Sequence, residues 1–112
     1  MKSFNVGSGR TCLNCDVNKI GSDYDITITG GEAHIGCVAL VNNGVYSLLI
    51  VDGHKEDEII QPLAKRLCNF KDLTFIIKAG VHLENISINE IDLVLDNNKK
   101  IIDILVDYFN VL

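Results

Sequence analysis

The spacing of apolar residues changes half-way along the chain, from every second position to the spacing of a helix. Apolar and polar residues alternate over residues 13–17 and 24–29, which is typical of strands with one buried face. Residues 34–41 and 45–51 are richer in apolar and β-branched residues and flank Asn-Asn-Gly at 42–44, a hairpin turn signal. The first half therefore predicts four strands.

Helical spacing begins near residue 56. Apolar residues over 56–69 fall on one helical face, although Pro62 lies inside this segment and would either kink the helix or belong to a first turn that begins later. Residues 73–79 form a β-rich run that Gly80 ends.

A long helix is predicted to follow this last strand. Ser87 and Glu90 have the spacing of a capping box. The helix should then run to about Phe109, and the polar residues 96–98 could interrupt it.

The predicted order is β-β-β-β-α-β-α. Strand 45–51, helix 56–69 and strand 73–79 form a βαβ crossover, which should be right-handed with its strands parallel. Antiparallel strands followed by a crossover predict an α+β fold, with one mixed, mainly antiparallel sheet and two helices packed on one face. A length of 112 residues fits a single domain over residues 1–112.

Charge and hydropathy argue against several classes of protein. Fifteen acidic residues oppose ten lysines and arginines, for a net charge of −5, which is the wrong sign for a general nucleic-acid or membrane-surface binder. No apolar run reaches the roughly 18–20 residues of a membrane span, and the N-terminus lacks the apolar stretch of a signal peptide. We therefore expect a cytoplasmic protein that binds neither nucleic acid nor membrane.

Four cysteines, at positions 12, 15, 37 and 68, should be free thiols in that compartment. Cys12 and Cys15 form a CxxC, but a structural zinc site needs further ligands at matching spacing. A thioredoxin-like motif lies between a strand and a helix, whereas this one lies in a predicted strand. Small, half-buried residues are the favoured interpretation, and a metal or redox role is the alternative.

Three histidines lie at predicted element boundaries. His34 begins a strand, His54 follows a strand and opens a helix, and His82 follows the last strand. If Val41 pairs with Val45, His34 lies opposite Asp52, two residues before His54. All three rings are then expected at one edge of the sheet, where open sheets with crossovers tend to bind ligands.

Acidic side chains and two helix N-termini are expected at the same edge. Helix N-termini favour anions such as phosphate. The acids are Glu32, Asp52, Glu56, Asp57, Glu58 and Glu84. Histidines with carboxylates could hold a divalent metal, with His34, His54 and His82 as candidate ligands. The same groups could instead bind a phosphorylated ligand, with Lys55 as a cation. The sequence has no GxSxG, GxGxxG or P-loop motif.

Three segments together carry a family resemblance. They are Gly-Gly-Glu-Ala-His-Ile-Gly at 30–36, Gly-His-Lys-Glu-Asp-Glu at 53–58 and Ala-Gly-Val-His-Leu-Glu-Asn-Ile at 79–86. In order and spacing, over roughly residues 25–91, they resemble the LpdD-like prenylated-flavin (prFMN) chaperone family, small accessory proteins of UbiD-type decarboxylases. The resemblance implies a non-catalytic protein that binds prenylated FMN for delivery to, or maturation in, the decarboxylase. It makes a UbiD-type decarboxylase and a flavin prenyltransferase the expected partners.

By motif match, the resemblance implies a set of cofactor contacts. Those at the ligand are His34, His54, Asp57 and His82, with Glu32, Lys55 and Asn85 behind them. Cys37 stands where the family pattern leads us to expect a smaller residue.

A chain this small would cover a flavin only in a shallow groove or with help from a second subunit. An uncovered edge strand also favours pairing between chains, so we expect a homodimer. Two alternatives remain beside the accessory role. One is a small metal-dependent enzyme, a lyase or hydrolase, that uses the three histidines; the other is a structural subunit of a decarboxylase complex.

Overall fold

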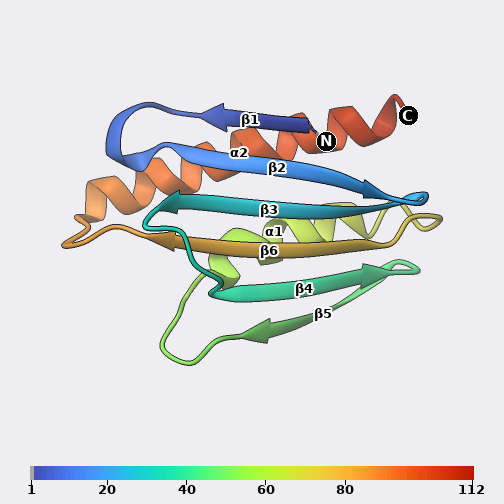
Figure 1. Ribbon diagram of the computed structural model, residues 1–112, viewed down its shortest axis with the longest axis horizontal. Coiled ribbons are helices and arrows are strands. Elements are labelled where there is room, and N and C mark those ends of the chain that lie inside the picture. The colour runs from blue at the N-terminus through green and yellow to red at the C-terminus, as the bar shows by residue number, and fades with distance from the viewer. Residues whose placement is uncertain (1) are drawn as a thin grey trace.

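Six strands form one mixed sheet in the computed structural model, which describes residues 2–112 (Figure 1). The strands are β1 (Lys2–Val6), β2 (Leu13–Ile20), β3 (Asp23–Gly31), β4 (Cys37–Asn42), β5 (Val45–Ile50) and β6 (Phe75–His82). Their order in the sheet is β1-β2-β3-β6-β4-β5. Neighbouring strands are antiparallel except β3 and β6, which are parallel.

Two helices, α1 (Asp57–Leu67) and α2 (Ile88–Asn110), lie behind the sheet in Figure 1, and a short 3₁₀ turn, η1 (Gly9–Thr11), follows β1. The predicted α+β class, with a mixed and mainly antiparallel sheet and two helices on one face, is confirmed. None of the helices described for residues 2–112 is long and apolar enough to cross a membrane.

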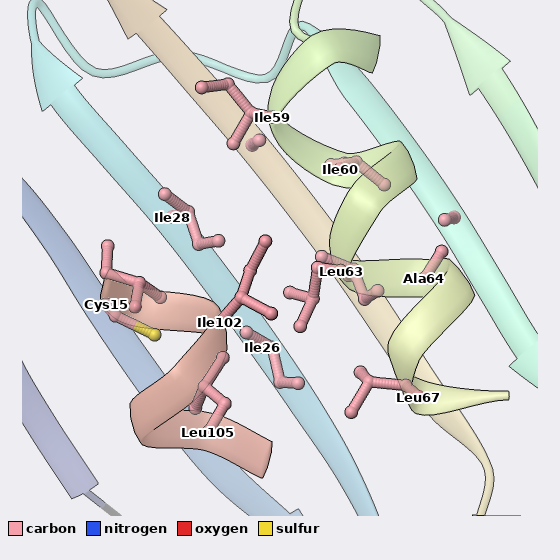
Figure 2. Close-up of a cluster of buried hydrophobic side chains, with 14 of the residues drawn as sticks. Cys15, Ile26, Ile28, Ile59, Ile60, Leu63, Ala64, Leu67, Ile102 and Leu105 are labelled. Atoms are coloured by element: carbon pink, nitrogen blue, oxygen red, sulfur yellow. The ribbon is translucent and has the colours of Figure 1, made fainter. Parts of the chain in front are cut away.

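The core lies between the sheet and the helices. Alternation turns every second side chain of each central strand toward the helices, as the sequence pattern requires. Figure 2 shows Ile26 and Ile28 of β3 on the helix-facing side of the sheet, in the same buried cluster as Leu63 of α1 and Leu105 of α2. All four are fully buried, and each such side chain stabilises the fold by about 1.5–3 kcal/mol relative to exposure.

The structure adds one strand and changes two strand boundaries. β1 was not predicted, because its alternation covers only five residues. The strand expected from His34 begins instead at Cys37, because residues 32–36 form a loop after Gly31, whose φ of 61° ends β3. β6 runs to His82, so this histidine ends the strand rather than following it.

The predicted hairpin is present, but its predicted register is wrong by one residue. Val45 pairs with Asn42, not with Val41, and His34 does not lie opposite Asp52 in the ladder. The turn consists of two residues, Asn43 and Gly44, with φ values of 53° and 79°. Positive φ at both central positions is the type I′ geometry that Asn-Gly favours.

The crossover also differs from the prediction. β5 and β6 run in the same direction, as expected, because both are antiparallel to β4. They are not neighbours, however, since β4 lies between them and β6 pairs in parallel with β3. β3, β5 and β6 consequently end at the same edge of the sheet, on the left in Figure 1.

Both predicted helices form, and neither is broken. α1 continues through Pro62. α2 continues through residues 96–98, so the predicted interruption there is wrong. The amide of Asn97 donates to the carbonyl of Thr11 (3.1 Å), and that of Asn98 donates to the carbonyl of Ile59 (2.9 Å). These amides bind neighbouring elements, so they do not compete with the hydrogen bonds of their own helix.

The four cysteines are free thiols. Cys15 lies in β2 and points into the core (Figure 2), and burial raises its pKa to about 12. A reactive cysteine needs a lowered pKa and access to solvent. Cys15 has neither, so packing accounts for this position of the CxxC.

Candidate functional site

Glycines allow the loop of residues 32–36 to cross the end of β6. The N–H of Glu32 donates to the carbonyl of His82 (2.9 Å), and that of Gly36 donates to the carbonyl of Ala79 (2.8 Å). A Cβ atom at Gly80 would lie 1.6 Å from the carbonyl oxygen of His34. Only glycine permits this approach, and the crossing places the ring of His34 above the edge of the sheet.

His54 and Glu56 reach the same point from the turn between β5 and α1. The N–H of His54 donates to the carbonyl of Val51 (3.0 Å), and Gly53 takes a φ of 81° in that turn. Glu56 occupies the N-cap position of α1, where its side chain makes no capping hydrogen bond, and it is buried, with 6% of its surface exposed. It lies three and four residues before Ile59 and Ile60, so it shares their core-facing side of the helix.

His34, His54 and Glu56 form a compact group, called here the His–Glu cluster. Nε2 of His34 lies 2.8 Å from Oε1 of Glu56 and 3.1 Å from Nδ1 of His54. Nδ1 of His54 lies 3.7 Å from Oε2 of Glu56. Among the residues that the structure describes, Oε2 has no hydrogen-bond partner, although it is buried. Two imidazoles and a carboxylate can share a proton or hold a divalent cation.

A cavity of about 320 Å³ adjoins the cluster, between the starts of α1 and α2. Its polar lining residues are His54, Lys55, Glu56, Glu58 and His82. Its apolar lining residues are Ile59, Val81, Leu83, Ile86, Ile91, Val94 and Leu95. A mostly apolar hollow with a few convergent polar groups is the usual form of a small-molecule site.

The structure brings together part of the predicted site. His54, Lys55 and His82 line the cavity. The ring of His34 lies 4.7 Å from that of His54 and 6.4 Å from that of His82, centroid to centroid, so the three histidines gather at one edge as expected.

The remaining predicted site residues, Asp57, Asn85 and Glu32, lie outside the cavity lining. Asp57 is the first residue of α1, and Asn85 holds a φ of 53° in the turn before α2. The side chain of Glu32 is exposed, but its carbonyl oxygen contacts Nδ1 of His34 at 3.1 Å.

Glu56 is a site residue that the sequence pattern did not distinguish from the other acidic residues at this edge. Among the described residues, the group with metal-ligand geometry is His34, His54 and Glu56, and His82 lies outside it. Helical spacing could have revealed this, because Ile59, Ile60 and Leu63 follow Glu56 by three, four and seven positions and form the buried face of α1. The apolar lining of the cavity was also not foreseen, because its members come from several elements.

The two helices begin at this edge, as predicted, but several of their first N–H groups already have partners. In α2 the N–H of Glu90 donates to the Ser87 hydroxyl, and the Glu90 carboxylate accepts from the N–H of Ser87. Arg10 also donates to this carboxylate and holds the pKa of Glu90 at about 2. In α1 the N–H groups of Glu58 and Ile59 donate to carbonyls in the preceding turn.

Comparison with known protein families identifies the family of this chain. A model of the prenylated flavin chaperone LpdD-like domain matches residues 7–110, which include the cluster and all the residues that line the cavity. The chain belongs to this family. The three segments that carried the sequence resemblance lie within the match, and membership in the LpdD-like family supports an accessory, chaperone-type role.

The fold has a counterpart among solved structures. The LpdD-like chain is similar to a chain in the crystal structure of a novel chaperone complex for yeast 20S proteasome assembly, with a TM-score of 0.61 and 10% identity, over 98% of this chain and 94% of that one. At that identity the likeness concerns the fold alone. No curated protein matches the sequence.

Proposed function

We propose that this LpdD-like domain is a non-catalytic accessory protein of the cytoplasm that binds prenylated FMN and supports its delivery to, or maturation in, a UbiD-type decarboxylase. A flavin prenyltransferase would supply the cofactor. The cavity carries the proposal, because its lining combines apolar and polar residues and a flavin has a flat apolar ring system and a polar, phosphorylated tail. Family membership over residues 7–110 supports it.

The residues of the cavity fit the two ends of this cofactor. The apolar lining residues, chiefly from α2 and the segment that joins it to β6, suit the flavin rings and the prenyl addition. His54, Lys55 and His82 suit the phosphate or the polar edge of the rings, with His34 beside them. Asp57, Glu32 and Asn85 would act from outside the cavity lining. Prenylated FMN supplies the decarboxylation chemistry once it is in the decarboxylase, whereas this chain binds and shields it.

A second copy of the chain would complete the enclosure of the bound flavin. A cavity of about 320 Å³ is at the small end of ligand sites, which range from about 300 to 1,000 Å³. The edge strand β5 and its neighbour β4 expose Leu40, Val45, Leu49 and Ile50. Exposed apolar edges favour association, so we propose a homodimer that pairs through β5.

Cofactor binding is tested by anaerobic native mass spectrometry with reduced prenylated FMN and, in parallel, plain FMN. The wild-type chain should bind the prenylated form. Ile91→Trp places an indole in the cavity wall and should abolish binding. Leu93→Trp is the matched control, because Leu93 lies on the same helix outside the cavity. Equal binding by both variants, or none by the folded wild-type chain, would overturn the proposal.

The contact residues and the transfer step need separate readouts. His54→Ala and His82→Ala should weaken cofactor binding without a large change in melting temperature, because both side chains are partly exposed. Transfer is measured by adding the loaded chain to an apo-decarboxylase and following cofactor incorporation by absorbance. A loaded chain that never yields its cofactor would contradict the delivery role.

The homodimer is tested by light scattering after size-exclusion chromatography. Leu49→Lys introduces a charge on β5 and should shift the chain to a monomer. Leu93→Lys, at a similarly exposed position of α2, should not. A monomeric wild-type chain would exclude this part of the proposal.

A further inference from the structure

The nitrogen and oxygen atoms of the His–Glu cluster are spaced like the ligands of one metal ion. Nε2 of His34 lies 2.8 Å from Oε1 of Glu56 and 3.1 Å from Nδ1 of His54, and Nδ1 of His54 lies 3.7 Å from Oε2 of Glu56. Two donor atoms bound about 2.1 Å from a tetrahedral zinc ion lie roughly 3.4 Å apart. The longest separation is too great for a hydrogen bond, but it suits two ligands of a shared ion.

The hydrogen bonds of His34 leave the centre of the cluster short of donors. Nδ1 of His34 faces the carbonyl oxygen of Glu32 at 3.1 Å, so this nitrogen carries a proton. In the neutral ring Nε2 then presents a lone pair toward Oε1 of Glu56 at 2.8 Å, so two acceptor atoms face each other. Oε1 also accepts from the N–H of Val81 (3.4 Å), and a proton on Nδ1 of His54 would be donated to Nε2 of His34 (3.1 Å), but neither hydrogen bond supplies a donor to Oε2. A proton on Nε2 would satisfy Oε1 of Glu56 but would still leave Oε2 without a partner. A cation among the three side chains would neutralise the whole carboxylate.

The surroundings of the cluster hold its members in place. The Glu32 carbonyl fixes the orientation of the His34 ring, as carbonyls and carboxylates commonly do for metal-ligating histidines. The side chain of Glu56 is 7% exposed, and a Cβ atom at Gly36 would lie 2.1 Å from its Oε2. The carboxylate is therefore packed against backbone and directed at the two rings.

We propose that His34, His54 and Glu56 bind one divalent transition-metal ion, with a remaining coordination position open to the cavity. Two imidazoles and one carboxylate suit zinc, cobalt, manganese or iron, whereas magnesium and calcium prefer oxygen ligands alone. His54 and Glu56 also line the cavity, so the open position would accept an anionic oxygen, such as a phosphate oxygen, of a molecule bound there. This last step rests on the proposed function, but binding of the ion does not.

The test uses the full chain, stripped with a chelator and titrated with Zn²⁺ by calorimetry and with Co²⁺ by visible absorption, in the absence of flavin. One ion per chain should bind, with the cobalt spectrum of a nitrogen- and oxygen-ligated site. His34→Ala and Glu56→Gln should lower the affinity at least about tenfold. Glu58→Gln is the control, since Glu58 lines the cavity but lies outside the cluster.

Two results would overturn the metal site. They are the absence of binding by the folded wild-type chain, and equal affinity in Glu56→Gln and Glu58→Gln. If Glu56→Gln fails to fold, His54→Ala replaces it, because the His54 side chain is 36% exposed. Cofactor binding is then measured with zinc and with chelator. Zinc binding without flavin binding would support the metal site and refute the proposed function. Flavin binding without zinc binding would refute the metal site and support the proposed function.

Discussion

Nε2 of His34 lies 2.8 Å from Oε1 of Glu56, although 22 residues separate them along the chain. His34 comes from the loop after β3, and Glu56 from the start of α1. These two segments are not consecutive in the sequence, and the contact exists because the loop crosses the end of β6. The contact therefore forms only when the loop, β6 and the start of α1 are all in place.

Removing the carboxylate from this pair should destabilise the metal-free protein. Glu56→Ala leaves a void beside His34 and should lower the free energy of unfolding by about 1–3 kcal/mol. Glu56→Gln should lose less, because its amide can donate to Nε2 of His34. Glu58→Ala, at an exposed position, should change stability by less than about 0.5 kcal/mol. Urea denaturation in chelator measures all three, and equal effects of the two alanine variants would contradict the buried role of Glu56.

The link between the two helices offers a second test. Asn98 is 2% exposed and donates to the carbonyl of Ile59 in α1. Asn98→Ala should cost about 1–3 kcal/mol of unfolding free energy, whereas Lys100→Ala, at an exposed position of the same helix, should be nearly neutral. Thermal and urea denaturation would check this. An unchanged midpoint for Asn98→Ala would show that the hydrogen bond adds nothing to helix packing.

Acid should weaken the fold through Glu90. Its hydrogen bond from Arg10 holds the Glu90 pKa at about 2, below the ordinary value of 4.5. The ionised carboxylate therefore stabilises the folded state above about pH 4.5, and this contribution is lost as the pH falls toward 2. Unfolding curves of the wild type and Glu90→Gln should differ by a constant amount near neutral pH and converge in acid.

Arg10→Gln provides the matched control for this pH dependence. It removes the guanidinium but leaves the capping box of Ser87 and Glu90 in place. The acid-dependent part of the stability should become smaller in this variant. A pH profile identical to that of the wild type would assign the lowered pKa of Glu90 to another cause.

Thiol reactivity should divide the four cysteines into two classes. Cys15 and Cys37 are fully buried, and burial raises the pKa of both thiols, that of Cys15 to about 12. Cys12 and Cys68 are half-buried. Iodoacetamide at mildly alkaline pH should therefore modify Cys12 and Cys68 first, and all four residues should react in urea. Peptide mass spectrometry locates the labels, and rapid labelling of Cys15 in the folded chain would revive a redox role for the CxxC.

Local sequence signals predicted most of the elements correctly. Alternation placed β2 and β3, runs rich in apolar and β-branched residues placed β5 and β6, and Asn-Gly marked the hairpin turn. The capping box of α2 is present as predicted. These features depend on residues within a few positions of one another, so they can be recognised without knowledge of the fold.

Long-range pairing determined the rest. The sequence placed three histidines at strand and helix boundaries, but the expected ladder contact of His34 with Asp52 does not exist. His34 reaches His54 because β6 inserts between β3 and β4, and because Gly80 lets the loop of residues 32–36 pass over it. Glu56 became a site residue only when α1 packed on the sheet and buried its carboxylate. Periodicity specifies which face of an element is buried, whereas the residues that meet at an edge depend on the order in which whole strands pair.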